Sequence, residues 1–250
     1  MWQITKRLIW CIYEYMAMFI GWGSLGLLCL FWFPVALVLE YLLPQKTGQK
    51  IGRFAIKTGF KFYLSILSTF CATKIDLIEL HSIAKQKQQI IIANHPSLLD
   101  AVLLLSVFDN AACVMKDKLM NNFLLGSAAR LAGFIPNSHP LQTILKARTE
   151  LQEQANLIVF PEGSRTITIE SFRCHPSIAL IAQNAQTDIQ VCVLVFSPDY
   201  LGKRWPWYQP PSLPMTIKAS HIATISYQQD SKQITTEIEQ KIKHALITSA

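Results

Sequence analysis

The residues from Tyr15 to Leu39 form an uncharged, largely apolar run of 25 amino acids. About 20 apolar residues allow an α-helix to cross the hydrocarbon core of a bilayer, so this run is long enough to span one. A cleaved signal peptide would have a shorter apolar core and a small-residue cleavage site. Pro34 and the glycines at positions 21, 23 and 26 leave two arrangements open, a single spanning helix and a kinked or re-entrant pair. We expect an N-terminal membrane-associated helical segment.

Basic residues follow this run at helical spacing. Five of them are 4, 3, 4 and 4 positions apart and share one side of a helix at about 100° per residue: Lys46, Lys50, Arg53, Lys57 and Lys61. Such a stripe is an ordinary solvated face or, directly after a membrane segment, a surface that rests on anionic headgroups. The Lys and Arg residues on this flank place its C-terminal side in the cytoplasm if the run spans. We predict that residues 1–72 are a membrane anchor with a basic amphipathic helix.

The distribution of charge and cysteine narrows the class of protein. The net charge is +7, and the first 61 residues account for +5 of it. A nucleic-acid-binding protein would carry this charge on its folded domain, so we expect no nucleic-acid partner. Charged residues make up 16% of the chain, against about 25% in a typical soluble domain, which favours contact with membrane lipids. The six cysteines form no C-x-x-C pair and indicate small buried residues in a reducing compartment.

From Lys74 onward, strand-like and helix-like patterns alternate, which is typical of a largely parallel, covered sheet. The pattern predicts strands at 74–80, 88–94, 111–115, 156–160 and 189–196, and helices at 97–108, 121–131, 140–155, 176–185 and 234–246. We therefore predict an α/β fold, with a largely parallel sheet flanked by helices. It forms one domain over residues 73–250 that ends in a C-terminal helix.

A histidine stands where this fold binds ligands. His95 follows a buried strand, at the carboxyl edge of the predicted sheet. Asp100 lies within a turn of it, and a carboxylate bonded to one imidazole nitrogen leaves the other nitrogen free to accept a proton. The alternative is structural, because Ser97 and Asp100 also have the spacing of a capping box.

A second polar block, from Leu157 to Thr166, follows another strand. Gly163 lets the backbone approach a ligand, and the amides around it could form an anion-binding nest. Arg165 offers a planar fork suited to phosphate. The structural alternative is a turn with a surface pair between Glu162 and Arg165.

Together the two blocks resemble the lysophospholipid acyltransferase family. The family's N-H-x-x-x-x-D block is matched by Asn94, His95 and Asp100, and its F-P-E-G-[ST]-R block by residues 160–165. Lys116, Gly126 and the segment 133–137 of this chain are similar to the family's second block. The resemblance covers about residues 74–198.

The resemblance implies acyl transfer from a thioester, with acyl-CoA or acyl carrier protein as co-substrate and no metal or other cofactor. The acceptor would be the hydroxyl of a lysophospholipid in phospholipid biosynthesis, and 1-acylglycerol-3-phosphate is the leading candidate. His95 would be the general base and Asp100 would orient it. The implied substrate-binding residues are Asn94, Lys116, Glu162, Gly163, Ser164, Arg165 and Arg173. The resemblance also favours a bacterial inner membrane, with the catalytic domain on its cytoplasmic face, and leaves the oligomeric state open.

The chain departs from the family pattern in the acceptor region. Asn137 and Ser138 stand where many members have an arginine, His175 replaces a glycine, and the segment 191–193 lacks a proline. A membrane acyltransferase of a specialised lipid pathway, with another acceptor, is therefore one alternative. A catalytically silent lipid-binding membrane protein is another. A covalent route through Ser97 or Cys113 is disfavoured because no G-x-S-x-G elbow is present.

Overall fold

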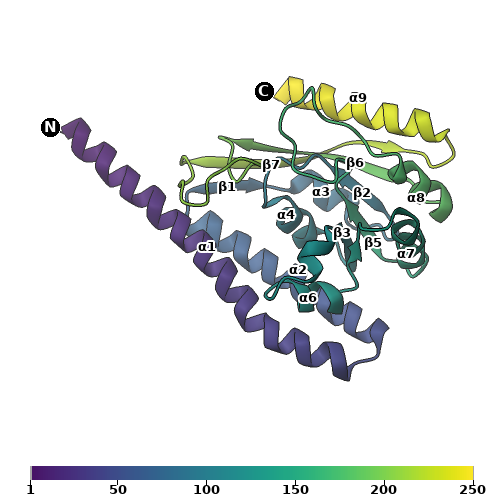
Figure 1. The fold of residues 1–250 in the computed structure, drawn as a ribbon. Coiled ribbons are helices and arrows are strands. Elements are labelled where there is room, and N and C mark those ends of the chain that lie inside the picture. Colours follow the sequence, from purple (N-terminus) through teal and green to yellow (C-terminus); the bar gives the residue numbers. More distant parts are fainter. Residues whose placement is uncertain (1, 250) are drawn as a thin grey trace.

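A seven-stranded sheet organises the α/β part of the chain, and the computed structural model describes residues 2–249 (Figure 1). The strand order is β1-β7-β6-β2-β5-β3-β4, and every neighbouring pair is parallel except β6 and β7. The strands are β1 (Thr73–Asp76), β2 (Ile90–Ala93), β3 (Ala111–Met115), β4 (Ile135–Pro136), β5 (Asn156–Val159), β6 (Ile189–Ser197) and β7 (Met215–Ile225). The predicted fold class is confirmed.

Helices cover both faces of this sheet. One buried hydrophobic cluster joins the sheet to the N-terminal helices and α4, and the other joins it to α7, α8 and α9. The helices after the N-terminal pair are α3 (Ile78–Ile83), α4 (Asp100–Val107), α5 (Asp117–Met120), α6 (Gly126–Leu131), α7 (Pro140–Gln152), α8 (Ser177–Ala185) and α9 (Ser231–Ser249). The sheet is thus a buried middle layer, as parallel strands with few polar residues require.

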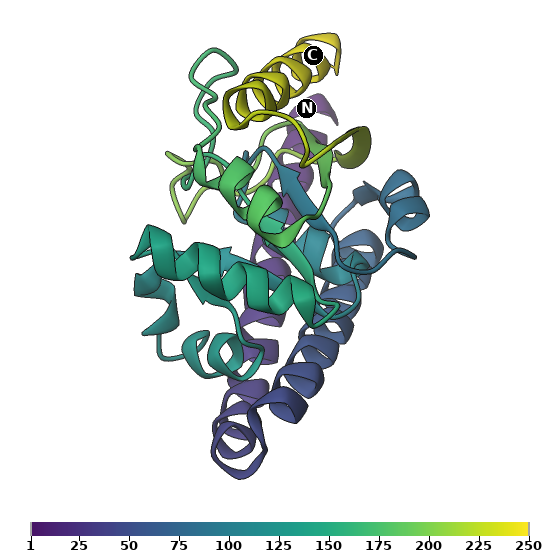
Figure 2. The same cartoon turned by 90° about the vertical axis from the view of Figure 1, so that its right-hand side faces the viewer.

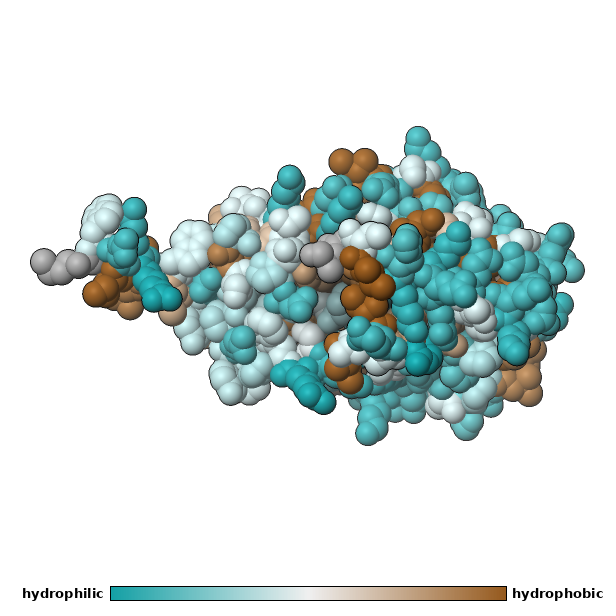
Figure 3. Space-filling view, turned by 90° about the horizontal axis from the view of Figure 1, so that it is seen from above, coloured by the Kyte–Doolittle hydropathy of each residue, from teal (hydrophilic) through white to brown (hydrophobic). Residues whose placement is uncertain are grey.

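Two long antiparallel helices precede the sheet and run along one side of it (Figures 1 and 2). The apolar run lies within the single helix α1 (Trp2–Leu42), which Pro34 does not interrupt, and the chain reverses before α2 (Gln45–Phe70). By length and composition α1 could cross a membrane, and it exposes many large apolar side chains. Its N-terminal turns stand clear of the rest of the molecule (Figure 3). This is weak support for membrane association, because the core helix of a soluble protein or a signal sequence can pass the same test.

The basic stripe of α2 does not form one lipid-facing surface, which corrects the expectation from its spacing. Arg53 is buried and forms an ion pair with Glu150 of α7. Lys57 forms an ion pair with Asp109, and Lys46 forms one with Glu153 of the same domain. Their charges dock α2 on the domain.

The structure differs from the local predictions most clearly in three places. The strand predicted at 74–80 ends at Asp76, whose carboxylate accepts a hydrogen bond from the Ile78 backbone and turns the chain into α3. The helix predicted at 121–131 begins only at Gly126. The Asn122 side-chain oxygen accepts hydrogen bonds from the Leu124 and Leu125 amides and so forms a turn before it. Strand β7 was not predicted, although buried and exposed residues alternate along its first half.

Candidate active site

Three loops meet at the carboxyl edge of the sheet, because β2, β5 and β6 are parallel neighbours. The loop after β2 carries His95, the loop after β5 carries Glu162, and the third loop follows β6. The Thr166 amide donates to the His95 carbonyl at 2.7 Å, and the Leu98 amide donates to the Leu201 carbonyl at 3.2 Å. These bonds join the three loops into one site.

His95 and Asp100 form a close pair at the centre of this site. His95 Nδ1 lies 2.7 Å from Asp100 Oδ2, and the same carboxylate oxygen accepts the Ser97 amide at 2.8 Å. The imidazole stacks on the Phe160 ring, with 4.3 Å between the ring centroids. The Asp100 carboxylate thus binds both the Ser97 amide and the histidine, whereas the Ser97 hydroxyl accepts the Leu99 amide, so only half of the capping box is formed. Because Nδ1 is bonded to the carboxylate, Nε2 is the nitrogen left to accept a proton.

The Asp100 carboxylate is completely buried. Burial raises the pKa of this carboxyl from its ordinary 3.8 to about 6, and the adjacent His95 and the charge of Arg165 oppose the rise. Since a protonated Asp100 could not stabilise an imidazolium, the ionised form is the one that supports general-base chemistry.

We expect kcat to fall as the pH is lowered through about 6, because Asp100 becomes protonated there. The raised pKa also means that the protonated carboxyl stabilises the fold below its ordinary pKa of 3.8, and that this contribution is lost as the pH rises through about 6. A pH–rate profile of the enzyme and its Asp100→Asn variant tests the expected fall in kcat. A profile with the same acid limb in both would contradict the assignment.

Thr166 is a further candidate site residue, which the sequence did not reveal. Its hydroxyl accepts the His95 backbone amide at 3.0 Å and donates a short hydrogen bond to Glu162. Burial raises the pKa of Glu162, and the Thr166 hydroxyl opposes that rise. Thr166 therefore fixes the histidine backbone and the glutamate carboxylate relative to each other. Only its place directly after the F-P-E-G-[ST]-R block could have drawn attention to it.

We expect Thr166→Val to lower kcat/KM about tenfold, the cost of a lost hydrogen bond of roughly 1.4 kcal/mol. Thr166→Ser keeps the hydroxyl and should recover most of that loss. Steady-state kinetics of the two variants make the comparison. Equal activity in both would show that the hydroxyl does not position the site.

Asn94 binds protein atoms with its whole side-chain amide, and Arg165 does so with one of its guanidinium nitrogens. Arg165 Nη1 donates to the carbonyls of Leu201 and Gly202, at 3.0 and 2.8 Å. The Asn94 side chain is buried and exchanges hydrogen bonds of 2.9 and 2.8 Å with the Leu194 backbone. These contacts favour a structural role for Asn94 over the predicted substrate contact, and they give Arg165 a role in holding the loop after β6.

The other predicted binding residues differ in their exposure and in their contacts. Gly163 has a left-handed φ of +63°, and an added Cβ there would meet no heavy atom within 4 Å. Ser164 is half-buried beside it. Lys116 is exposed at the end of β3, and Arg173 is exposed and donates to the carbonyls of Glu170 and Phe172. Within residues 2–249, no hydrogen bond or ion pair joins Lys116 or Arg173 to His95 or Glu162.

The candidate nucleophiles are poorly placed for covalent catalysis. Ser97 is fully buried, and its hydroxyl accepts the Leu99 amide at 3.2 Å. Cys113 is buried in β3, and burial raises the pKa of its thiol to about 12, so the thiolate is scarce at neutral pH. Both observations support direct transfer over a covalent intermediate.

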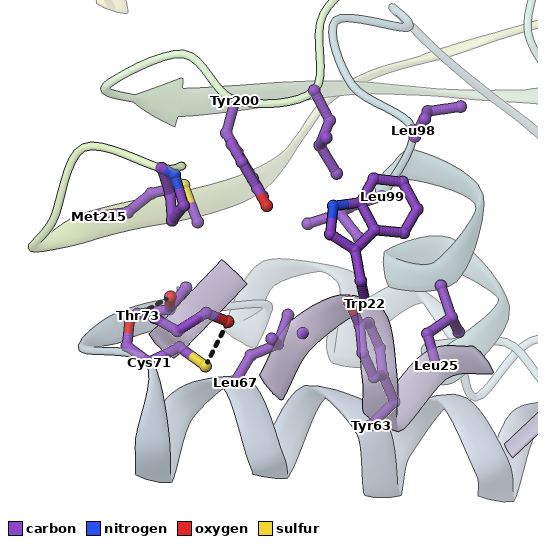
Figure 4. Close-up of a pocket in the computed structure, with 14 residues that line it drawn as sticks. Trp22, Leu25, Tyr63, Leu67, Cys71, Thr73, Leu98, Leu99, Tyr200 and Met215 are labelled. Atoms are coloured by element: carbon purple, nitrogen blue, oxygen red, sulfur yellow. Dashed lines mark hydrogen bonds between the residues drawn. The ribbon is translucent and has the colours of Figure 1, made fainter. Parts of the chain in front are cut away.

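An apolar pocket lies next to the catalytic loop (Figure 4). Its cavity measures about 50 Å³. Trp22 and Leu25 of α1, Tyr63 of α2, Leu99 before α4 and Tyr200 after β6 contribute to its wall. Thus the pocket is formed jointly by the N-terminal helices and the α/β domain.

The site therefore combines a histidine–carboxylate pair with a Glu-Gly-Ser-Arg loop at one edge of the sheet. Residues 74–196 match the family model described as Acyltransferase, and this domain belongs to that family. No curated protein sequence matches the chain. The crystal structure of the 1-acyl-sn-glycerophosphate (LPA) acyltransferase PlsC from Thermotoga maritima has a similar fold, with a TM-score of 0.72. The match covers 96% of this chain and 97% of that one at 16% identity.

Proposed function

We propose that this protein transfers a fatty acyl group from a thioester of coenzyme A or acyl carrier protein to the hydroxyl of 1-acylglycerol-3-phosphate, in phospholipid biosynthesis. The observation that carries the proposal is the hydrogen bond between His95 and the buried Asp100, beside the Glu162 loop. The acyltransferase family match of residues 74–196 supports the reaction class. The acceptor follows from the resemblance and from the similar fold of an LPA acyltransferase.

In the proposed reaction, His95 Nε2 takes the proton of the acceptor hydroxyl while that oxygen attacks the thioester carbonyl. The carbon–sulfur bond then breaks, the new ester forms, and the thiolate takes the proton back from the imidazolium. Asp100 holds the ring by Nδ1 and stabilises its positive charge between these two transfers. No covalent acyl-enzyme and no metal ion is part of this route.

The apolar pocket borders the His95 loop, because Leu98 and Leu99 are part of its wall. Its cavity of about 50 Å³ is far smaller than the roughly 300–1,000 Å³ of ligand-binding pockets, so it does not hold a whole acyl chain in this structure.

We further propose that residues 1–72 attach the enzyme to a bacterial inner membrane, with the domain of residues 73–250 on the cytoplasmic face. The apolar side chains exposed along α1 support this placement, and so do the cations on its flanks. Membrane lipids would then be both solvent and substrate for the site.

The proposal is tested with detergent-purified protein, acyl-CoA or acyl carrier protein thioester, and a panel of acceptors. The panel contains 1-acylglycerol-3-phosphate, lysophospholipids with larger headgroups, and 1-acylglycerol, with products identified by mass spectrometry. Formation of phosphatidic acid supports the proposal. Acylation of another lipid alone would support the specialised-pathway alternative, which the exposed Asn137 at the end of β4 favours. No consumption of either thioester with any acceptor would leave a lipid-binding protein.

A further inference from the structure

Two of the basic residues expected to recognise a phosphate, Arg165 and Arg173, each use one guanidinium nitrogen to bind backbone carbonyls. One guanidinium nitrogen of Arg165 holds two carbonyls of the loop after β6. Arg173 caps two carbonyls of its own loop, and Asn137 stands where an arginine was expected. A phosphate monoester binds best to several cations near the reacting hydroxyl, so another source of positive charge next to this site would compensate for the arginine that Asn137 replaces.

The loop after β6 carries two cations at the tip of a tight turn. The Trp205 amide donates to the Gly202 carbonyl at 3.1 Å, which closes a four-residue turn with Lys203 and Arg204 at its centre. Both side chains are exposed. The turn therefore presents two adjacent positive charges to solvent.

This turn is fixed against the catalytic loops. Arg165 binds the carbonyls of Leu201 and Gly202 at its base, and the Leu98 amide binds the Leu201 carbonyl. On its other side, Trp205 packs edge-on against Tyr200, with 5.4 Å between the ring centroids. A turn held at both ends is preorganised, so it loses little conformational freedom on binding.

The turn lies next to the Glu162 loop. The carbonyl of Gly202, directly before Lys203, accepts a hydrogen bond from Arg165 of that loop at 2.8 Å. The ammonium of Lys203 also opposes the rise in the pKa of the Glu162 carboxyl. Gly163, the neighbour of Glu162, has open space where a side chain would lie.

We propose that the Lys203–Arg204 turn recognises the phosphate monoester of the acceptor and so determines acceptor specificity. This rests on the proposed acyl transfer to a phosphate-bearing lipid. The turn would hold the phosphate while the acceptor hydroxyl lies at His95. Arg165 would then be a positioning residue that acts through the turn.

The test compares Lys203→Ala and the double variant Lys203→Ala/Arg204→Ala with the wild-type enzyme. Lys232→Ala removes an exposed lysine from α9 and is the matched control. We expect KM for 1-acylglycerol-3-phosphate to rise about tenfold or more in the double variant, as for the loss of a charge-assisted hydrogen bond. The KM for the thioester and the kinetics with phosphate-free 1-acylglycerol should stay within twofold. Lys203→Arg should retain most of the affinity.

Each other outcome overturns the proposal. A rise in KM for the thioester alone would assign the turn to the phosphates of the donor. An unchanged KM for the acceptor would leave the turn without a role in binding. Failure of the proposed function looks different, since the wild-type enzyme itself would then make no phosphatidic acid. If it acylates another phosphate-bearing lipid, the same KM comparison applies to that lipid, and use of phosphate-free acceptors alone would contradict both proposals.

Discussion

Replacing His95 with alanine lowers kcat for acyl transfer by about 10²- to 10⁴-fold, the usual contribution of a general base. The structure gives this residue a single position, since Asp100 holds its Nδ1, Phe160 stacks on its ring and Thr166 binds its backbone. No other titratable side chain in residues 2–249 shares a hydrogen bond with this imidazole. Release of the free thiol, followed with a thiol reagent, measures the rate.

The matched control is His139→Ala, which removes an exposed histidine just before α7. It should retain the wild-type rate and the thermal stability of the parent. His95→Ala also removes the partner of the buried Asp100, so circular dichroism must show that this variant is folded before its rate is compared. Wild-type turnover in His95→Ala would show that another group removes the proton, or that the uncatalysed attack is fast once the substrates are bound.

Replacing Arg53 with alanine lowers the free energy of unfolding by about 3–5 kcal/mol, the cost of breaking a buried ion pair on one side only. The exposed fractions of the Arg53 and Glu150 side chains are 4% and 13%, and Nη2 lies 2.5 Å from the carboxylate. The same guanidinium donates to the Ala132 carbonyl at 2.8 Å and to Asn110 at 3.0 Å. The variant thus leaves two polar oxygens without this donor, and it leaves the Glu150 carboxylate with the Gln49 side chain, at 3.2 Å, in place of an ion pair.

The double variant Arg53→Met/Glu150→Met separates the ion pair from the packing of α2. Two apolar side chains leave no unpaired charge, so we expect it to regain much of the lost stability. Lys50→Ala, at an exposed position of α2, is the control and should change stability by no more than about 0.5 kcal/mol. Denaturation in detergent, followed by circular dichroism, compares the three. A loss as large in the double variant as in Arg53→Ala would mean that the guanidinium is needed for its shape, not for its charge.

Residues close in sequence to the two motif blocks could be predicted, and residues placed by distant loops could not. Parallel strands end at the same edge of a sheet. His95 and Glu162 each follow a predicted strand closely, and this was enough to bring them to one site. The sequence did not show that one oxygen of Asp100 binds both the Ser97 amide and the histidine. Spacing shows that two groups can meet, not that one oxygen serves both.

The roles of Arg165 and Arg53 show why the rest was hidden. A guanidinium suits phosphate, carboxylate and carbonyl oxygens alike, so residue type does not identify its partner. Arg165 binds a loop 36 residues further along the chain, and Arg53 binds a carboxylate 97 residues away. Helical spacing correctly placed Arg53 on a stripe, yet it could not show that the domain covers part of that stripe. Partners of this kind are decided by tertiary packing.

The contacts of α1 with the end of the sheet also impose an order on biogenesis. The Trp10 indole donates to the Leu213 carbonyl, and Glu14 accepts the Leu213 amide, 199 positions along the chain. At 5–20 residues per second, a ribosome needs about 10–40 s to make that intervening length. During this interval the apolar side of α1 exists without its docking partner. Under the proposed attachment of α1 to a membrane, the bilayer would cover this side first, and the active site would be completed at the membrane surface.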